Sequence, residues 1–199
     1  MGSRRMEFTY VSDADLRTML FNNGLADELQ LGRFRLINEQ YKQLRLYYQP
    51  TPGTRDWIET RLEPMGNGFA ENCRITLATA SLGNTNAPAV LVTMEWKMSD
   101  RGGETSRRAI NLIDIAREPF LVLRSETFVG RLSSDHDTEA EPTETSCEQS
   151  ITLRNREIVI SAPEEVGDSD CELTLLPAGH YRYQKRKGVA YGEIAAIKE

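Results

Sequence analysis

The sequence predicts a mainly β protein whose antiparallel strands follow a single N-terminal helix. The first observation is an alternation of apolar and polar residues with a period of two. It is clearest at Val90, Val92, Met94 and Trp96, which would share one face of a strand. The second is regular punctuation by turn residues, as at residues 50–53. Short strands separated by such turns are typical of a β-sandwich or a β-barrel.

A helix is expected over residues 13–29. The Ser12 side chain can cap it, with Asp15 completing a capping box. Apolar residues from Leu16 onward approximate a helical stripe, and the Asn-Asn-Gly run at residues 22–24 weakens its middle. The segment therefore forms one helix or two short ones.

The rest of the chain is interpreted as antiparallel strands with one buried face each. Every run of alternating residues is bounded by Gly, Pro or Asn turns. The strands are expected near residues 32–38, 41–49, 56–63, 72–80, 89–98, 106–115, 120–130, 150–161, 171–176, 179–185 and 189–197.

Residues 133–149 differ from the rest of the chain in composition. Acidic residues occur there with Thr, Ser and Pro and with almost no apolar side chain. Such a stretch cannot offset the entropy cost of ordering by burial. We predict a mobile acidic insertion between two strands, and an acidic arm that binds a basic partner is the functional alternative.

Length and composition limit the class of protein. The 199 residues, 39% of them hydrophobic, predict one domain over residues 1–199. The net charge of -6 argues against nucleic-acid binding, because affinity for the phosphate backbone comes from Lys and Arg. No apolar run reaches the roughly 18 residues of a membrane span, and none follows Arg4 and Arg5 as in a signal peptide.

The cysteines predict a reducing compartment. Cys73, Cys147 and Cys171 are an odd number, and their spacing is not that of metal ligands. Reduced thiols and a cytoplasmic location fit this pattern better than a disulfide framework.

Several familiar catalytic motifs are missing from the sequence. It has no glycine-rich phosphate loop, no His-Glu-x-x-His helix and no Gly-x-Ser-x-Gly elbow. The histidines are His136, in the acidic segment, and His180, so a metal site or a Ser-His-Asp triad would depend on His180 alone. We expect no metal site, and we interpret His180 as a turn residue beside Gly179.

The interior of the predicted fold is a better candidate for a binding site. A small antiparallel barrel can enclose one small ligand in a mostly apolar pocket. Met94 and Trp96 share a face, where Met adapts to irregular shapes and Trp offers a flat surface for stacking. Both are also ordinary core residues, so a filled core is the alternative.

Arginines in the predicted strands are a second indication. A buried guanidinium needs a carboxylate, so an inward-pointing arginine could hold a ligand's carboxylate. The alternative is cross-strand pairing with Glu59, Glu63, Glu95 and Glu126. The arginines concerned are Arg33, Arg35, Arg45, Arg61, Arg74, Arg124 and Arg182.

The sequence predicts a helix that leads into Leu31-Gly32-Arg33-Phe34, followed by a meander of strands with Arg182 near its end. This order of elements resembles the calycin arrangement of lipocalins and fatty-acid-binding proteins. In that superfamily a Gly-x-Trp on the first strand packs against an arginine on the last. Here Phe34 stands where the tryptophan is expected. The resemblance implies a lipocalin-like, closed antiparallel β-barrel.

Within the calycins, the chain resembles the S-type phycobiliprotein lyases of cyanobacteria and cryptophytes. These small barrels hold an open-chain tetrapyrrole, a bilin, and deliver it to a cysteine of an antenna protein. The resemblance rests on residues 57–59, on Thr93-Met94-Glu95-Trp96 and on residues 156–163 and 192–194. The family's Gln-Arg-Thr stretch after the first strand is replaced here by residues 37–40.

The resemblance implies a bilin ligand without a tightly bound cofactor, and a phycobiliprotein subunit as the client. Met94 and Trp96 would flank the pigment rings, and Arg182 would hold a propionate. Glu193 or Glu157 would protonate the pigment while a thiolate of the client attacks it.

Two alternatives stay open. Another alignment places residues 171–174 where Arg182 stands, which would remove the anchoring arginine. The chain could also be a non-catalytic, calycin-like binding or assembly protein with another hydrophobic ligand or a protein partner. Its working surface would then be an edge strand or the acidic segment. The sequence leaves open whether it acts as a monomer, a homodimer or a heterodimer.

Overall fold

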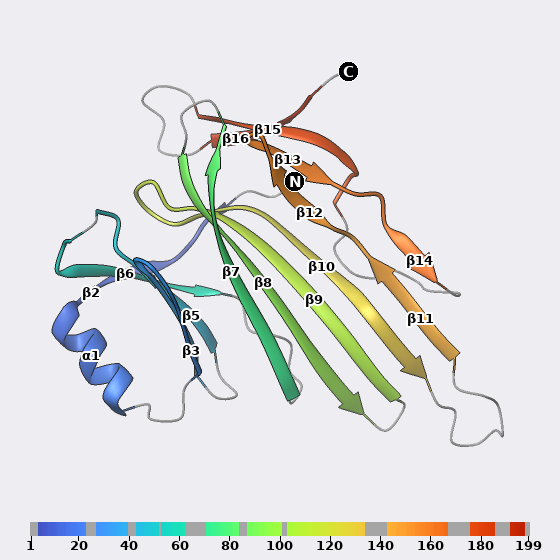
Figure 1. Ribbon diagram of the computed structural model, residues 1–199, viewed down its shortest axis with the longest axis horizontal. Coiled ribbons are helices and arrows are strands. Elements are labelled where there is room, and N and C mark those ends of the chain that lie inside the picture. Colours follow the sequence, from blue (N-terminus) through green and yellow to red (C-terminus); the bar gives the residue numbers. More distant parts are fainter. Residues whose placement is uncertain are drawn as a thin grey trace.

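The computed structural model describes most of the chain. The described residues are 4–22, 27–39, 43–51, 53–62, 71–83, 87–100, 103–133, 143–166, 176–185 and 192–197. They form three antiparallel sheets and one short helix (Figure 1). The expectation of a mainly β, antiparallel protein with an N-terminal helix is therefore confirmed.

The N-terminal sheet is a five-stranded antiparallel sheet in the order β2-β6-β5-β4-β3. Its strands are β2 (Phe8–Ser12), β3 (Asp27–Leu31), β4 (Phe34–Glu39), β5 (Gln43–Tyr48) and β6 (Asp56–Leu62). The helix α1 (Asp13–Asn22) leaves directly from β2. The Ser12 hydroxyl oxygen accepts a hydrogen bond from the Asp15 N–H at 3.1 Å, which is the predicted cap.

The helix predicted over residues 13–29 is wrong beyond Asn22. Asp27–Leu31 is strand β3, paired antiparallel with β4. The Asn and Gly residues that follow α1 in the sequence are poor helix formers. Gly32, at φ +55°, adopts the left-handed conformation that glycine tolerates, and it turns the chain from β3 into β4.

The central sheet is the largest. Its main path runs β14-β11-β10-β9-β8-β7, and β1 also pairs with β10. Its strands are β1 (Arg4–Arg5), β7 (Glu71–Leu82), β8 (Ala87–Asp100), β9 (Gly103–Asp114), β10 (Phe120–Ser133), β11 (Thr143–Glu148) and β14 (Glu164–Val166).

The C-terminal sheet has four strands in the order β12-β13-β15-β16. Its strands are β12 (Ile151–Arg154), β13 (Glu157–Ile160), β15 (Gly179–Lys185) and β16 (Gly192–Ala196). The single strand predicted over residues 150–161 is a hairpin, because Asn155 and Arg156 turn the chain at φ +50° and +68°. The strand predicted at 179–185 is confirmed, and the one predicted at 171–176 lies outside the described residues except for Leu176.

Two hydrophobic cores lie on the two faces of the central sheet. In the main core, Val92 and Met94 of the central sheet pack with Leu46 and Ile58 of the N-terminal sheet. In the second core, residues of the other face, such as Leu112, pack with the C-terminal sheet. Helix α1 covers the outer face of the N-terminal sheet through the buried Leu16. The layers are therefore α1, the N-terminal sheet, the central sheet and the C-terminal sheet.

The expected closed barrel is not detected among the described strands. In a continuous meander β6 would pair with β7, but here β2 occupies that edge of β6, with Phe8 opposite Thr60. The N-terminal sheet therefore ends at β2, and the central sheet ends at β7. A period-two pattern indicates which face of a strand is buried, but it does not indicate which strand pairs with which edge.

Part of the predicted acidic insertion is a strand. Within the range 133–149, residues 143–148 form β11, which pairs with β10 on one side and with β14 on the other. Gln149 is also buried. Residues 134–142 lie outside the described part. Polar residues can be ordered by pairing with a long neighbouring strand, here β10, and composition alone does not indicate such pairing.

The expectation of reduced thiols is wrong for Cys147. This residue is buried in β11 and is disulfide-bonded. The side chains of Cys73 and Cys171 lie outside the described part of the chain. The cytoplasmic location rested partly on reduced thiols, so it stays a prediction with less support.

Candidate functional site

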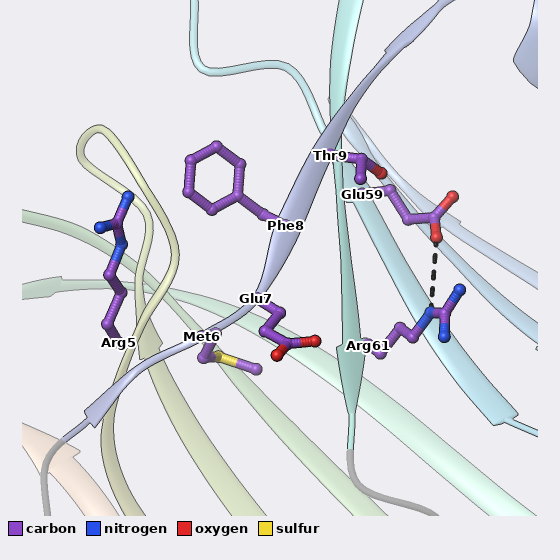
Figure 2. Close-up of a pocket in the computed structure, with 7 residues that line it drawn as sticks. All are labelled: Arg5, Met6, Glu7, Phe8, Thr9, Glu59 and Arg61. Atoms are coloured by element: carbon purple, nitrogen blue, oxygen red, sulfur yellow. Dashed lines mark ion pairs between the residues drawn. The ribbon is translucent and has the colours of Figure 1, made fainter.

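A groove of about 600 Å³ lies where the N-terminal segment crosses from the central sheet to the N-terminal sheet. Five of the lining residues are consecutive, Arg5 to Thr9, and the others, Glu59 and Arg61, belong to β6. Figure 2 shows Phe8 on one side of the extended segment and Glu7, Glu59 and Arg61 on the other. The groove therefore follows a strand and has an apolar and a charged part.

Pairing at both ends holds the segment along the groove in an extended conformation. Arg5 pairs with Phe120 of β10, and the Met6 N–H donates to the Pro119 carbonyl at 3.2 Å. At the other end the segment becomes β2, and the Thr60 hydroxyl donates to the Glu7 carbonyl at 2.9 Å. The groove is thus built on a fixed backbone.

The apolar part of the groove consists of Met6 and Phe8. Both are partly buried and pack against the main core. The Arg5 guanidinium lies 5.7 Å from the centre of the Phe8 ring and forms an ion pair with Glu118 at 2.8 Å. These contacts leave one side of the groove able to accept an apolar side chain.

The charged part is organised around Glu59, which is almost fully buried. The Tyr47 hydroxyl donates to Glu59 Oε2 at 2.9 Å, and Arg45 Nη1 lies 3.2 Å from Oε1. Arg61 Nε is more distant, at 3.9 Å from the same oxygen. Burial raises the pKa of Tyr47 above its usual value, and the hydrogen bond to Glu59 raises it further. Glu59 therefore acts as a fixed anion that holds Arg45, whereas Arg61 stays largely exposed.

Met94 and Trp96 point inward, as predicted. They are 0% and 2% exposed and belong to the main core, and neither lines the groove. The Trp96 indole N–H is buried and has no hydrogen-bond partner among the described residues. Directly opposite Trp96 on β9 is Arg107, which forms an ion pair with Glu126 at 3.6 Å.

The other predicted site residues lie on the C-terminal sheet. Arg182 is half exposed, and its Nη2 lies 3.0 Å from Glu157 Oε1 on the neighbouring strand. Glu193 is exposed on β16. The structure thus brings Arg182 and Glu157 together, but it separates them from Met94 and Trp96, which face the opposite side of the central sheet.

Two strand arginines form cross-strand pairs, Arg45 with Glu59 and Arg182 with Glu157, and the first of these is a pair of the alternative interpretation. Arg124 and Arg61 lie near glutamates of their own strands, with Arg124 Nη2 3.3 Å from Glu126 Oε2 and Arg61 Nε 3.9 Å from Glu59 Oε1. Arg35 instead lies over the Trp57 ring, at 5.3 Å from its centre. His180 is on β15, with Nδ1 3.9 Å from Glu157, so it is a strand residue rather than a turn residue.

Sequence reasoning missed the groove because it did not predict strands before residue 13. Phe8 and Tyr10 alternate with polar residues and could have indicated a strand. The sequence predicts Glu59 only as a cross-strand partner of an arginine, and it is one. Its place beside the groove could not be predicted, because it depends on the pairing of β2 with β6.

In the described part of the chain no group of three or more His, Cys, Asp or Glu side chains could hold a metal ion. No described helix has the length and apolar character needed to cross a bilayer.

Comparison of the chain with protein-family models, with curated proteins and with solved structures finds no match. The resemblance to calycins and to phycobiliprotein lyases therefore rests on the sequence motifs and stays a prediction.

Proposed function

We propose that this chain is a binding protein that holds an extended polypeptide segment in the groove along Arg5–Thr9. The observation that carries the proposal is the position of the groove, which follows a strand at the edge of the N-terminal sheet. Peptides often bind such an edge as an additional strand, because the main chain then supplies affinity and alternate side chains supply specificity.

The edge strand β2 is suited to such an addition. It pairs with β6 on one side, and no described strand pairs with its other side. Alternate side chains of an added strand would point to opposite faces. One set would meet Met6 and Phe8, and the other would meet Glu7 and Thr9.

The charges beside the groove favour a segment with both signs of charge. Glu7 is exposed and forms no ion pair with a described residue, and Arg61 is held only at 3.9 Å by Glu59. A basic side chain of the ligand would complement Glu7, and an acidic one would complement Arg61. The expected ligand therefore alternates apolar residues with charged ones.

A selection of random peptides on the purified chain tests the proposal. Enriched peptides should alternate apolar and charged residues, and a labelled copy should bind in a fluorescence anisotropy titration. Glu7→Lys should weaken binding about tenfold, which corresponds to about 1.4 kcal/mol, because it reverses an exposed charge at the groove. Arg182→Ala, on the C-terminal sheet, is the control and should bind as the wild type does. Equal binding by the Glu7→Lys variant would overturn the proposal.

A bilin held beside Trp96 is a second candidate function, favoured by the indole N–H without a described partner. A buried donor of this kind is rare, because its lost hydrogen bond with water is not replaced. A pigment oxygen could accept from it, with Arg107 and Arg124 on the same face to attract a propionate.

The bilin proposal is tested by titrating the chain with biliverdin and following the visible absorbance. A shifted and sharpened band is expected for the wild type, and Trp96→Phe should weaken it while it keeps the ring in the core. Arg182→Ala tests which arginine holds the propionate. The variant should bind biliverdin more weakly if Arg182 is the anchor, as the family resemblance implies, and as the wild type does if the arginines near Trp96 hold it. An unchanged spectrum with the wild type would remove the bilin function and leave the groove proposal intact.

A further inference from the structure

We infer that two copies of this chain associate edge to edge through β7, antiparallel across a two-fold axis. This strand is the edge strand at one end of the central sheet, and no described strand pairs with its outer edge. It has 12 residues, whereas the other described strands that pair on one side only have between 2 and 5. Because each residue of an edge strand adds unpaired N–H or C=O groups, β7 is the longest edge available for pairing.

The outer edge of β7 has few of the features that usually prevent such pairing. Proteins protect long edges with prolines, several charges or bulges. Between Arg74 and Leu82 the strand contains no proline, and Arg74 is its one charged residue. The register with β8 is regular over this stretch, and the irregularity lies before Arg74.

The side chains at this edge are only partly covered. Ile75 and Leu77 lie on the face that packs against the main core, and both remain partly exposed. On the other face Thr76 and Ala78 are exposed. A further strand beside β7 would cover the remaining surface of Ile75 and Leu77, and burial of apolar surface favours association.

The occupant that fits is a second copy, because the edge is complementary to itself. With the two-fold axis at Thr76, each Ile75 lies opposite Leu77 of the other copy. The same register places Arg74 opposite Ala78 and Thr76 opposite Thr76, so that no like charges meet. Apolar pairs and Thr–Thr pairs across strands are favourable, whereas like charges directly opposite are not.

A charge-exchange experiment on the full chain tests the inference. Analytical ultracentrifugation of the wild type should give twice the 22.5 kDa mass of one chain. Thr76→Lys should halve the measured mass, because the two-fold places two lysines opposite each other. Thr76→Glu should do the same, and an equimolar mixture of the two variants should restore the doubled mass. Since Thr76 is exposed, both variants should keep the circular dichroism spectrum of the wild type, which shows that the monomers are folded.

The matched control is Thr152→Lys, which makes the same change at an exposed residue of the short end strand β12. It should leave the doubled mass unchanged. A wild type that remains at the mass of one chain at about 100 µM would overturn the inference. A doubled mass that persists in both Thr76 variants would also overturn it, because the association would then use another surface.

Discussion

Gln149 connects three segments of the chain through its buried side-chain amide. Its Oε1 accepts hydrogen bonds from the Ser125 hydroxyl at 3.2 Å and the Leu176 N–H at 2.9 Å. Its Nε2 donates to the Ser161 carbonyl at 3.1 Å and to the Leu176 carbonyl at 2.6 Å. The amide thus satisfies polar groups of Ser125 and Leu176 in buried hydrogen bonds beside the second core.

Gln149→Leu should therefore lower the free energy of unfolding by about 1–3 kcal/mol, because it leaves buried polar groups of Ser125 and Leu176 without partners. Urea unfolding followed by circular dichroism measures the change. Gln184→Leu, at an exposed position of β15, is the matched control and should change stability by less than about 0.5 kcal/mol. Equal stabilities of the two variants would contradict the role of Gln149.

Three buried tyrosines predict how stability depends on alkaline pH. Burial raises the pKa of Tyr47, Tyr48 and Tyr183, and hydrogen bonds to carboxylates raise those of Tyr47 and Tyr183 further. Above the usual tyrosine pKa of about 10, the unfolded chain loses these protons while the folded chain keeps them. Since the unfolded state then binds fewer protons, the free energy of unfolding should fall as pH rises through this range.

An ultraviolet absorbance titration measures this directly. Of the seven tyrosines in the chain, these three should ionise only when circular dichroism shows that the protein unfolds. Tyr183→Phe should reduce the amplitude of that late step by about a third, because one of three phenols is removed. Ionisation of all three in the folded protein would contradict the prediction.

At the scale of single strands, period-two alternation predicted the long strands well. Residues 120–133 and 179–185 are strands close to their predicted bounds, and Met94 and Trp96 face the core as expected. The strands that were missed, such as 8–12, 143–148 and 164–166, are short, and 143–148 and 164–166 are also mostly polar. Their stability depends on pairing with longer strands, which a local pattern does not contain.

Strand β11 supplies the prediction at this scale. Because it pairs with β10 on one side and β14 on the other, its amides should exchange slowly with deuterium despite their acidic sequence. The exposed end strand β14 should exchange faster. Mass spectrometry of peptides that cover residues 143–148 and 164–166 measures both, and exchange of β11 at the rate of an unstructured peptide would contradict the pairing.

At the scale of the whole molecule, the arrangement of the layers decides which predicted residues can act together. The sequence predicts that Met94 and Trp96 face inward, but not that the N-terminal sheet covers that face while the C-terminal sheet covers the other. Arg182, Glu157 and Glu193 lie in the C-terminal sheet and thus behind the central sheet as seen from Trp96. Only the pairing of whole strands determines this, because it joins residues far apart in the chain.

The disulfide at Cys147 adds a covalent constraint to this layered structure. Reduction should lower the free energy of unfolding by about 2–4 kcal/mol, because it returns conformational entropy to the unfolded chain. Urea unfolding with and without a reductant measures the difference, and Cys147→Ser should abolish it. Alkylation of the unfolded, unreduced chain should modify one cysteine of the three. Modification of all three would show that the thiols are reduced, as the cytoplasmic location predicts, and the stability would then depend on the cores alone.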